Sequence, residues 1–332
     1  MSMNLLVIFF DGLGDRPVPE LGRKTPLEAA ATPNIDRLAR EGINGLLHAK
    51  SPGYPLGSPL ALHLLFGYSE DSFPDRGPLL ARARNVHVAE GEVVLAARFA
   101  STVKEDRRLR LIQRFVCGRE EACQTLAEAV AKTEIDGLRF RYVYCGRGDG
   151  LLLISGGASH EVTDTDPFAL NQPILRAHAR AEARDPELAT HTARALNEWG
   201  VWAHRVLSEH PASNGAGYLP PINSVIAKWA GLKPSLEPFV EKWGMSPGSL
   251  PDEEVVNGLM LEMGFHLIQI SNTDPENDLR ERLIQAQNLV QDGYEFIHVH
   301  TKYPDPISHD NEPERARDAI EALDRAMGWY WQ

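Results

Sequence analysis

The sequence predicts an α/β protein in which a mainly parallel sheet is flanked by helices and carries an inserted α+β lobe. Two observations predict this class. Uninterrupted apolar runs at 5–10 and 296–300 are typical of strands that are buried on both faces of a parallel sheet. Short, partly alternating strands replace the helix-rich pattern between about residues 76 and 179. We therefore expect a core of residues 1–75 and 180–332, and a lobe of residues 76–179.

For the N-terminal part of the core, the sequence predicts two strands and two helices. The run at 5–10 is the first strand. A Thr-Pro step at 32–33 offers an N-cap followed by proline at the first helical position, and Gly42 ends that helix. A short strand at 45–49 and a helix at 60–66 follow, separated by a loop rich in proline and glycine.

The lobe and the rest of the core alternate between strands and helices. In the lobe we expect one helix at 123–131 and strands at 86–88, 93–99, 109–112, 140–144 and 150–154. After the lobe we expect helices at 191–209, 278–290 and 314–327, and strands at 265–270 and 296–300. The last helix is amphipathic, with its apolar side chains on one face.

The bulk composition excludes several classes of partner. The 332 residues are 43% hydrophobic and 24% charged, which is typical of a globular protein. A net charge of −12 argues against nucleic acid and anionic membranes, and a small phosphorylated ligand would need a local basic pocket. Cys117, Cys123 and Cys145 form no disulfide framework and have no zinc-finger spacing, so we expect a reducing cytoplasm. The apolar start is too short to span a membrane.

Four polar residues follow the apolar runs or lie between them. Asp11 follows the first run, Ser58 lies in a Gly-Ser loop, and Asp305 and His309 come shortly after the second run. An acid at the end of a buried strand is costly unless it meets a cation or a donor. Two such strand ends with a hydroxyl between them predict an oxygen- and nitrogen-ligated metal site, a layout typical of phosphoryl transfer.

Each of these residues also has a simpler interpretation. A strand-end acid such as Asp11 often caps a nearby helix, and a loop serine such as Ser58 often forms a turn. The D-x-x-x-H spacing of 305–309 also arises on solvated helix faces. His298 and His300 alternate along one strand face, where buried core histidines are the expected outcome.

Basic residues offer candidate anion-binding groups at two places. Lys302 either meets a phosphate or pairs with an acid, and the sequence favours neither. The lobe carries a basic cluster that consists of Asp106, Arg107, Arg108 and Arg110. Arginine binds carboxylate and phosphate through two parallel hydrogen bonds. The alternative is that these charges protect a solvated strand edge.

Matches along the whole chain resemble one enzyme family. They lie at 24–42, 57–58, 66–68, 76–78, 162–167, 195–197, 210–211 and 299–302. In this order they resemble the cofactor-independent phosphoglycerate mutases of the archaeal type, which belong to the alkaline phosphatase superfamily of two-metal phosphoryl-transfer enzymes. The resemblance implies an alkaline-phosphatase-like core.

The resemblance also implies an activity and roles for the candidate residues. It implies interconversion of 3-phosphoglycerate and 2-phosphoglycerate in glycolysis, without 2,3-bisphosphoglycerate. Ser58 would attack the phosphate and become a phosphoserine. Mn²⁺ or Zn²⁺, with Mg²⁺ as a further candidate, would be held by Asp11, Ser58, Asp305 and His309. The substrate would be held by Asp106, Arg107, Arg108, Arg110 and Lys302.

The chain also departs from the family pattern. The family's Asp-His pair and a later histidine have no counterpart, and no Asp-His dipeptide occurs in the sequence. Pro59 replaces the acid that usually follows the serine, and Phe168 replaces a histidine. Substitutions also fall at 96–98 and 219–223. Two expectations follow, a C-terminally truncated chain or a divergent member without mutase activity.

Two other functions stay open on the sequence alone. One is a related metal-dependent phosphatase or phosphotransferase that acts on another small phosphoester. The other is a non-catalytic relative that binds a ligand or a partner protein through the old cleft and an uncovered sheet edge, which would also allow a homo-oligomer.

Overall fold

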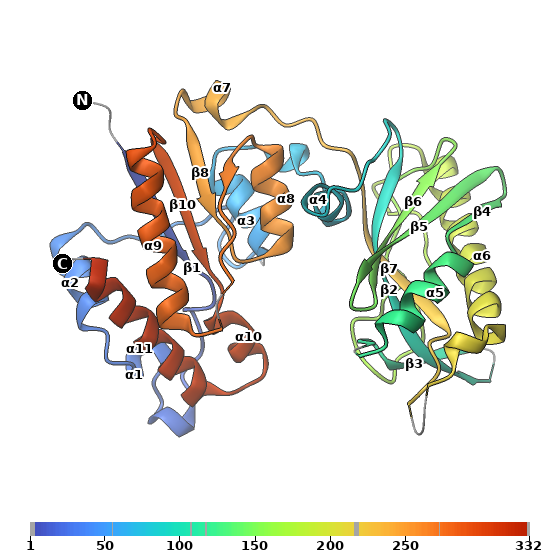
Figure 1. Cartoon of the computed structure of the whole chain (residues 1–332), viewed down its shortest axis with the longest axis horizontal. Coiled ribbons are helices and arrows are strands. Elements are labelled where there is room, and N and C mark those ends of the chain that lie inside the picture. Colours follow the sequence, from blue (N-terminus) through green and yellow to red (C-terminus); the bar gives the residue numbers. More distant parts are fainter. Residues whose placement is uncertain are drawn as a thin grey trace. The chain divides into compact units, whose positions relative to one another are not determined.

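The structure is a computed structural model that describes residues 4–54, 56–106, 108–116, 118–215, 219–271 and 273–330. The chain divides into two compact units (Figure 1). Unit 1 consists of Met1–Asp71 and Leu236–Gln332, and unit 2 consists of Ser72–Ser235. None of the described helices is both long enough and apolar enough to cross a membrane.

Unit 1 contains a parallel sheet in the order β1-β10-β8-β9. Its strands are β1 (Leu5–Phe10), β10 (Phe296–Thr301), β8 (Pro247–Leu250) and β9 (His266–Leu267). The register pairs Leu5 with Phe296 and Phe10 with Thr301. The two apolar runs are therefore parallel neighbours that end side by side, and the predicted α/β class with a parallel sheet is confirmed.

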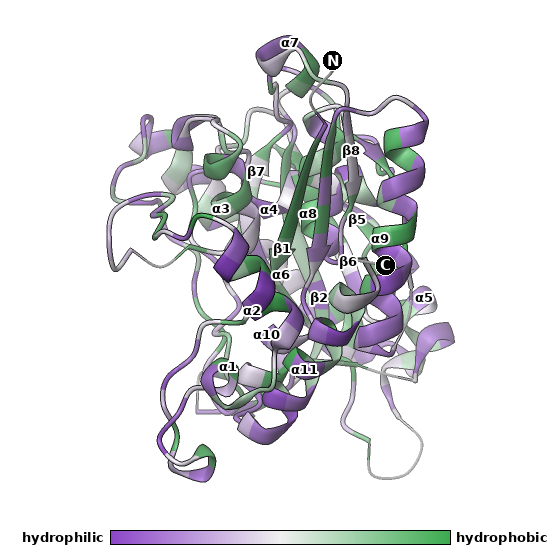
Figure 2. Ribbon diagram, turned by 90° about the vertical axis from the view of Figure 1, so that its left-hand side faces the viewer, coloured by the Kyte–Doolittle hydropathy of each residue, from purple (hydrophilic) through white to green (hydrophobic). Residues whose placement is uncertain are grey.

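One face of the parallel sheet packs against three helices. They are α2 (Pro33–Glu41), α9 (Pro275–Gln291) and α11 (Pro313–Tyr330). Leu6 and Ile8 of β1 and Val299 of β10 join the same core as Leu283 of α9 and Leu323 of α11. Figure 2 colours β1 as hydrophobic along its length. A strand with helices on both sides needs apolar residues at every position, which explains the uninterrupted run.

The opposite face of the sheet carries aromatic and histidine rings. Phe296 and His298 of β10 contact Phe66, which follows α3 (Ser58–Leu65), at ring distances of 5.5 Å each. Phe239, at the start of α7 (Phe239–Trp243), lies 4.6 Å from Phe296. His298 and His300 are fully buried, as expected for core histidines. The helix α8 (Glu254–Glu262) packs against α3 and against β9.

Of the first two helices of unit 1, α2 begins where the sequence predicts, and α1 was not predicted. In α1 (Pro26–Ala29) the side chains and backbone N–H groups of Thr25 and Glu28 form a reciprocal capping box. For α2 the predicted N-cap is wrong in its chemistry, because the Thr32 side chain caps no backbone N–H. The buried Asp324 carboxylate of α11 accepts hydrogen bonds from the N–H groups at the start of α2 instead. A tertiary partner therefore replaces the local cap.

Unit 2 is built on a six-stranded antiparallel sheet in the order β3-β2-β6-β5-β4, with β7 also paired to β2. The strands are β2 (Val93–Glu105), β3 (Arg108–Gln113), β4 (Lys132–Ile135), β5 (Leu138–Gly146), β6 (Asp149–Ser155) and β7 (Ser224–Leu232). Its helices are α4 (Arg76–Ala83), α5 (Glu120–Ala129) and α6 (Pro186–Glu209).

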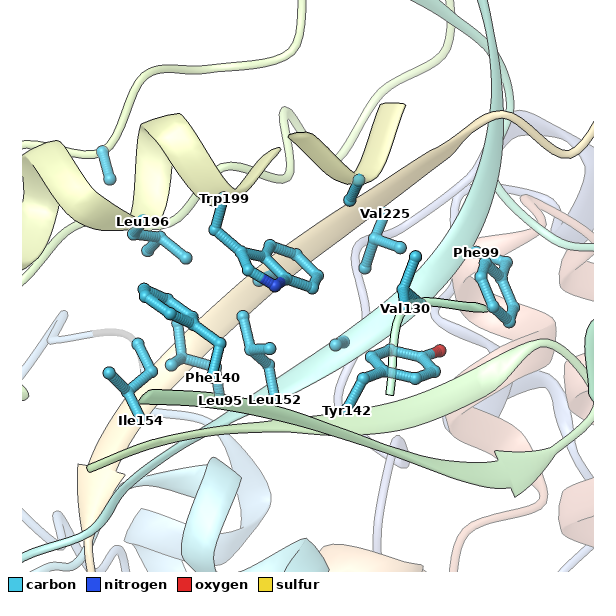
Figure 3. Packing of buried hydrophobic residues seen from close by; sticks show 14 of the residues in the cluster. Leu95, Phe99, Val130, Phe140, Tyr142, Leu152, Ile154, Leu196, Trp199 and Val225 are labelled. Carbon is cyan, nitrogen blue, oxygen red and sulfur yellow. The ribbon is translucent and has the colours of Figure 1, made fainter. Parts of the chain in front are cut away.

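The core of unit 2 lies between its sheet and α6. Trp199 of α6 points at the sheet and stacks on Phe140 of β5 with ring centroids 6.0 Å apart (Figure 3). Leu95 and Leu152 lie in the same cluster and are fully buried. The Asp185 side chain accepts a hydrogen bond from the Leu188 N–H, which fixes the start of this long helix. The helix therefore belongs to the lobe's own core.

Several sequence expectations are corrected by the structure. The predicted end of the lobe at residue 179 is wrong, because β7 pairs with β2 and extends unit 2 to Ser235. No strand forms at 45–49, where Leu46 and Leu47 are almost fully exposed and have no sheet partner to pair with. No strand forms at 86–88 either, and the strand expected at 265–270 is reduced to His266–Leu267.

Candidate functional site

The ends of β1 and β10 bring two predicted site residues to the same edge of the sheet. Asp11 follows β1 and Lys302 follows β10, and the parallel register sets these ends side by side. The Asp11 N–H donates to the Thr301 carbonyl at 2.9 Å, which extends the ladder by one step. Ligands of open α/β sheets bind at the carboxyl ends of the strands. The site therefore starts at this edge.

Ser58 is brought to Asp11 by the start of α3. It is the first residue of the helix, and its Oγ donates to Asp11 Oδ2 at 2.6 Å. Pro59 occupies the second helical position and is buried. A backbone N–H at that position has no partner within the helix, so proline costs nothing there. The substitution of the usual acid by Pro59 therefore leaves the position of Ser58 intact.

Lys302 lies among acidic side chains. Its Nζ is 2.8 Å from Glu253 Oε2, 3.4 Å from Asp305 Oδ2 and 3.7 Å from Asp11 Oδ2. Its backbone N–H donates to Asp252 Oδ2 at 2.8 Å. The sequence left open whether Lys302 meets a phosphate or pairs with an acid. In the structure Lys302 is paired with acids.

The charges in this group stabilise one another. Burial tends to raise the pKa of Asp11, but the neighbouring His300 side chain, the hydrogen bond from Ser58 and the charge of Lys302 outweigh it and lower the pKa to about 2. Burial tends to lower the pKa of Lys302, but the hydrogen bond and charge of Glu253, with Asp305 and Asp11, raise it overall. Both groups are therefore charged at neutral pH.

His300 is a buried group that the sequence did not connect with the site. Its side chain is fully buried, and Nε2 lies 3.6 Å from Asp11 Oδ2. Among the described residues, neither ring nitrogen has a hydrogen-bond partner, and the same holds for the buried Thr301 hydroxyl. Unpaired buried polar atoms cost free energy, so their position beside Asp11 calls for a functional explanation.

Asp305 and His309 lie on the short helix α10 (Pro304–His309). Asp305 faces Lys302, whereas the His309 side chain is 80% exposed and its Nε2 lies 3.6 Å from Asp305 Oδ1. Gly12, at φ 85°, allows the Asp11 loop to approach α10 closely, since a Cβ there would lie 2.8 Å from the Asp305 Cβ. The structure thus brings Asp11, Ser58 and Asp305 together and leaves the His309 side chain exposed to solvent.

The oxygen and nitrogen donors of this group are of the kind that Mn²⁺ and Zn²⁺ prefer. Their arrangement, however, does not fit a divalent ion. Within the described part of the chain, no group of three or more His, Cys, Asp or Glu side chains is placed to hold one. The ammonium group of Lys302 lies 2.8–3.7 Å from an oxygen of each of the three carboxylates, Asp11, Glu253 and Asp305.

The loop between β8 and α8 is held by a buried arginine. Arg282 of α9 is fully buried and donates to Asp278 and to the carbonyls of Leu250 and Pro251. It also donates to Asp252, whose other oxygen receives the Lys302 N–H. Sequence reasoning missed this loop because β8 is short and contains proline and glycine. The signal was a run of acids after residue 250, as at Asp11.

The predicted basic cluster lies in unit 2, around the turn between β2 and β3. Asp106 forms that turn at φ 53°, and Arg107 lies outside the described residues. Arg110 pairs with Glu105 and donates to a backbone carbonyl, so its guanidinium is already engaged. Arg108 is exposed and lines a cavity of ≈ 1340 Å³ beside α6.

A second group of cations in unit 2 was not found from the sequence. Arg114 and Lys228 flank the buried Asp166, with Nη2 of Arg114 at 2.6 Å and Nζ of Lys228 at 3.5 Å from Oδ2. Nearby, Arg98 pairs with Asp149 at 2.5 Å. Burial, with the charges of Arg114 and Arg98, outweighs Asp166 and lowers the pKa of Lys228 to about 8. This group is a partly exposed concentration of positive charge.

The aromatic rings beside these cations hold them in place. Lys228 Nζ lies 3.8 Å from the Trp229 ring centroid, and the Arg98 guanidinium lies 4.2 Å from that of Phe115. Phe168, at the position where the resemblance implies a histidine, lies 5.2 Å from the Arg114 guanidinium. Cation–π contacts stabilise positive charge without neutralising it, but Arg98 and Arg114 are also paired with Asp149 and Asp166. Three cations against two carboxylates leave this group with one net positive charge.

Comparison with known proteins places this geometry in context. The family model for 2,3-bisphosphoglycerate-independent phosphoglycerate mutase matches residues 39–213. A relative from Methanocaldococcus jannaschii with that name is 33% identical over 98% of this chain and 76% of its own length. One from Ignicoccus hospitalis is 32% identical over 99% of this chain and 80% of its own length.

Solved structures agree with these relatives. The cofactor-independent phosphoglycerate mutase of Thermoplasma acidophilum is 28% identical with a TM-score of 0.61, covering 98% of this chain and 83% of its own. A protein from Pyrococcus horikoshii is 25% identical with a TM-score of 0.75, covering all of this chain and 78% of its own.

Proposed function

The chain belongs to the 2,3-bisphosphoglycerate-independent phosphoglycerate mutases, and from this we propose that it interconverts 3-phosphoglycerate and 2-phosphoglycerate through Ser58. The single observation that carries the proposal is the contact between Ser58 Oγ and Asp11 Oδ2 at 2.6 Å. It sets a hydroxyl nucleophile at a helix start, beside an ionised carboxylate and at the carboxyl edge of a parallel sheet.

The start of α3 suits an anionic group on Ser58. The first backbone N–H groups of a helix have no partner within it, and the helix dipole makes this end positive. Phosphate groups bind at such helix starts. Ser58 is the first residue of α3, and Pro59 has no N–H, so a phosphoryl group on Ser58 Oγ would lie beside the remaining N–H donors of the first turn.

The proposed reaction consists of two phosphoryl transfers at one serine. In the first, Ser58 Oγ forms a bond to phosphorus while the bond between phosphorus and the C3 oxygen of the substrate breaks, and the Ser58 hydroxyl proton ends on the departing C3 oxygen. In the second, the C2 hydroxyl of the glycerate attacks the phosphoserine, the Ser58 Oγ–phosphorus bond breaks, and the C2 hydroxyl proton ends on Ser58 Oγ. Asp11, with a pKa of about 2, orients the Ser58 hydroxyl and is too weak a base to remove its proton fully before attack.

The substrate anion requires local positive charge, because the whole chain carries a net charge of −12. We assign substrate binding to unit 2, with Arg98, Arg114 and Lys228 as the group that the geometry favours. The substrate-binding residues suggested by the sequence, Asp106, Arg107, Arg108 and Arg110, also remain candidates. Of the described arginines in this cluster, Arg108 is exposed, whereas Arg110 is paired with Glu105.

Family membership implies a divalent cation, which would be Mn²⁺ or Zn²⁺, with Mg²⁺ as a further candidate. The proposal includes this cation on that ground alone. Lys302 stands where Asp11 and Asp305 would hold such an ion. From the same family membership we propose that unit 1 is the phosphoryl-transfer core. We also propose on this ground that the protein acts in glycolysis in the cytoplasm. The absence of 2,3-bisphosphoglycerate from the reaction agrees with the family's name.

The test is the substitution Ser58→Ala in the full chain. We expect turnover of 3-phosphoglycerate to fall by roughly a thousandfold or more, because no other group accepts the phosphoryl moiety. Formation of 2-phosphoglycerate is followed with an enolase-coupled assay. The matched control is Ser51→Ala in the exposed loop before α3, which should leave turnover unchanged.

Two outcomes would contradict the proposal. Equal turnover in wild-type and Ser58→Ala protein would exclude the serine as nucleophile. Release of phosphate from p-nitrophenyl phosphate by the wild type, without any mutase turnover, would favour the phosphatase or phosphotransferase that the sequence left open.

A further inference from the structure

The face of α6 that turns away from the sheet carries an exposed stripe of side chains. On the inner face, Trp199 and its buried neighbours pack against the sheet of unit 2 (Figure 3). Residues three or four positions apart share one face of a helix, and the outer face follows this spacing. The outer stripe consists of Arg194, Glu198, Val201, Trp202, Arg205 and Glu209.

Two apolar side chains lie in the middle of the outer stripe. Val201 is 72% exposed, and the half-buried Trp202 follows it. Both line the cavity of ≈ 1340 Å³ beside α6, which Ile174 and the exposed Leu175 also line. Removing such apolar surface from water favours association, so an exposed patch of this kind indicates a contact surface.

Charged side chains stand on both sides of this apolar centre. Toward the start of α6 the order is Arg194 and then Glu198, and toward its end it is Arg205 and then Glu209. The reverse of this order has the opposite sign at every charged position. Among the described residues, the side chains of Glu198, Arg205 and Glu209 have no hydrogen-bond or ion-pair partner, whereas Arg194 pairs with Asp136. Three charges are therefore available to a partner.

We propose that the outer stripe is the contact surface of a two-fold dimer of this chain, in which the two copies of α6 pack antiparallel. With the two-fold axis at the step from Val201 to Trp202, Glu198 lies opposite Arg205 of the partner subunit. Arg194 lies opposite Glu209 of the partner subunit at the ends of the contact. In a two-fold contact each of these pairings occurs twice.

The order of the charges selects both the partner and the orientation. The outer stripe is complementary to its own reverse, which is the property that a two-fold contact between identical chains requires. In a parallel two-fold pair, Glu198 would face Glu198 of the partner subunit, and like charges facing each other oppose association. The antiparallel pair also places the apolar residues at the centre and the charges at the rim, as in other protein interfaces.

The experiment measures association of the full chain by sedimentation velocity over a range of concentrations. We expect the wild type to dimerise and Glu198→Arg to raise the Kd of the dimer by at least about tenfold, because each contact then holds two pairs of like charges. Arg205→Glu should have the same effect. The double variant Glu198→Arg with Arg205→Glu restores opposite charges and should regain a Kd close to that of the wild type.

Glu128→Arg is the matched control. Glu128 lies on α5 of the same unit, is exposed, and has no ion-pair partner among the described residues. Its substitution changes the net charge of the chain as much as Glu198→Arg does, and the Kd should equal that of the wild type. Both Glu198 and Arg205 are exposed, so circular dichroism should show an unchanged fold in every variant.

Three results would overturn the proposal. The first is a wild type that stays monomeric at concentrations up to about 100 µM, because a specific contact is expected to associate there. The second is a dimer that Glu198→Arg leaves as tight as before or that Glu128→Arg weakens equally. The third is a double variant that associates no more tightly than the single variants. No substrate is present in these measurements, so the result is separate from that of Ser58→Ala.

Discussion

At the scale of single residues, the cations of unit 2 show how burial tunes charge. Lys228 is largely buried beside Arg114 and Arg98, and its pKa is lowered to about 8 from 10.5. Burial is the largest cause, and the two arginines add to it against the attraction of Asp166. An arginine in the same place would keep its charge, since its guanidinium is protonated at every accessible pH.

This shift predicts a pH dependence of substrate binding. As pH rises through about 8, Lys228 loses its proton and unit 2 loses one positive charge. We expect kcat/KM for 3-phosphoglycerate to fall by up to about tenfold between pH 7 and pH 9, one unit above the pKa. Lys228→Arg should flatten this decline. The measurement is the pH profile of kcat/KM for both proteins, and parallel profiles would exclude Lys228 as the titrating group.

At the scale of elements, the loop between β8 and α8 depends on a buried ion pair from a distant helix. Arg282 and Asp278 lie one turn apart on α9 and are 0% and 1% exposed. Arg282 spans from Asp278 to the carbonyls of the loop and to Asp252, which in turn receives the Lys302 N–H. The position of Asp252 and of the adjacent Glu253 beside Lys302 therefore depends on the contacts between Arg282 of α9 and this loop.

We expect Arg282→Met to destabilise the protein by roughly 3–5 kcal/mol, because it leaves the Asp278 carboxylate buried without its partner. Arg325→Met is the control, since Arg325 pairs with Glu276 at an exposed surface and such pairs contribute about 0–1 kcal/mol. Urea unfolding followed by circular dichroism gives both values. Similar losses for the two variants would show that the buried pair adds little to stability.

At the scale of the whole molecule, the two units differ in how they are built from the chain. Unit 2 is one continuous segment with its own core, in which Trp199 of α6 packs against the sheet (Figure 3). Unit 1 requires segments from both ends of the chain, because β1 pairs with β10. A continuous segment with a closed core is expected to fold alone.

We therefore predict that the fragment 72–235 folds independently. It should show a dispersed amide NMR spectrum and cooperative unfolding in urea. The matched control is the fragment 72–179, which ends at the boundary that the sequence predicted and lacks both α6 and β7. That fragment loses the Trp199 side of the core and should not unfold cooperatively. If both fragments behave alike, α6 and β7 do not belong to the folding unit.

The chain by itself determined the elements whose pattern is local or strongly periodic. The apolar runs at 5–10 and 296–300, the helices at 32–42 and 60–66, and most strands of the lobe follow from runs, caps and alternation. Asp11 and Ser58 were also identifiable, from a strand-end acid and a Gly-Ser step. These features depend on neighbours in the sequence, so the sequence contains the information needed to predict them.

Tertiary structure decided what depends on distant partners. The lobe ends at Ser235 because β7 pairs with β2, and α2 is capped by Asp324 from the far end of the chain. Glu253, which pairs with Lys302, lies on the loop that Arg282 of the distant helix α9 contacts at Leu250 and Asp252. Lys302 pairs with acids because three separate segments bring carboxylates to it. The physical reason is that the charge and burial of a side chain depend on contacts with residues far away in the sequence. No local sequence pattern predicts those contacts.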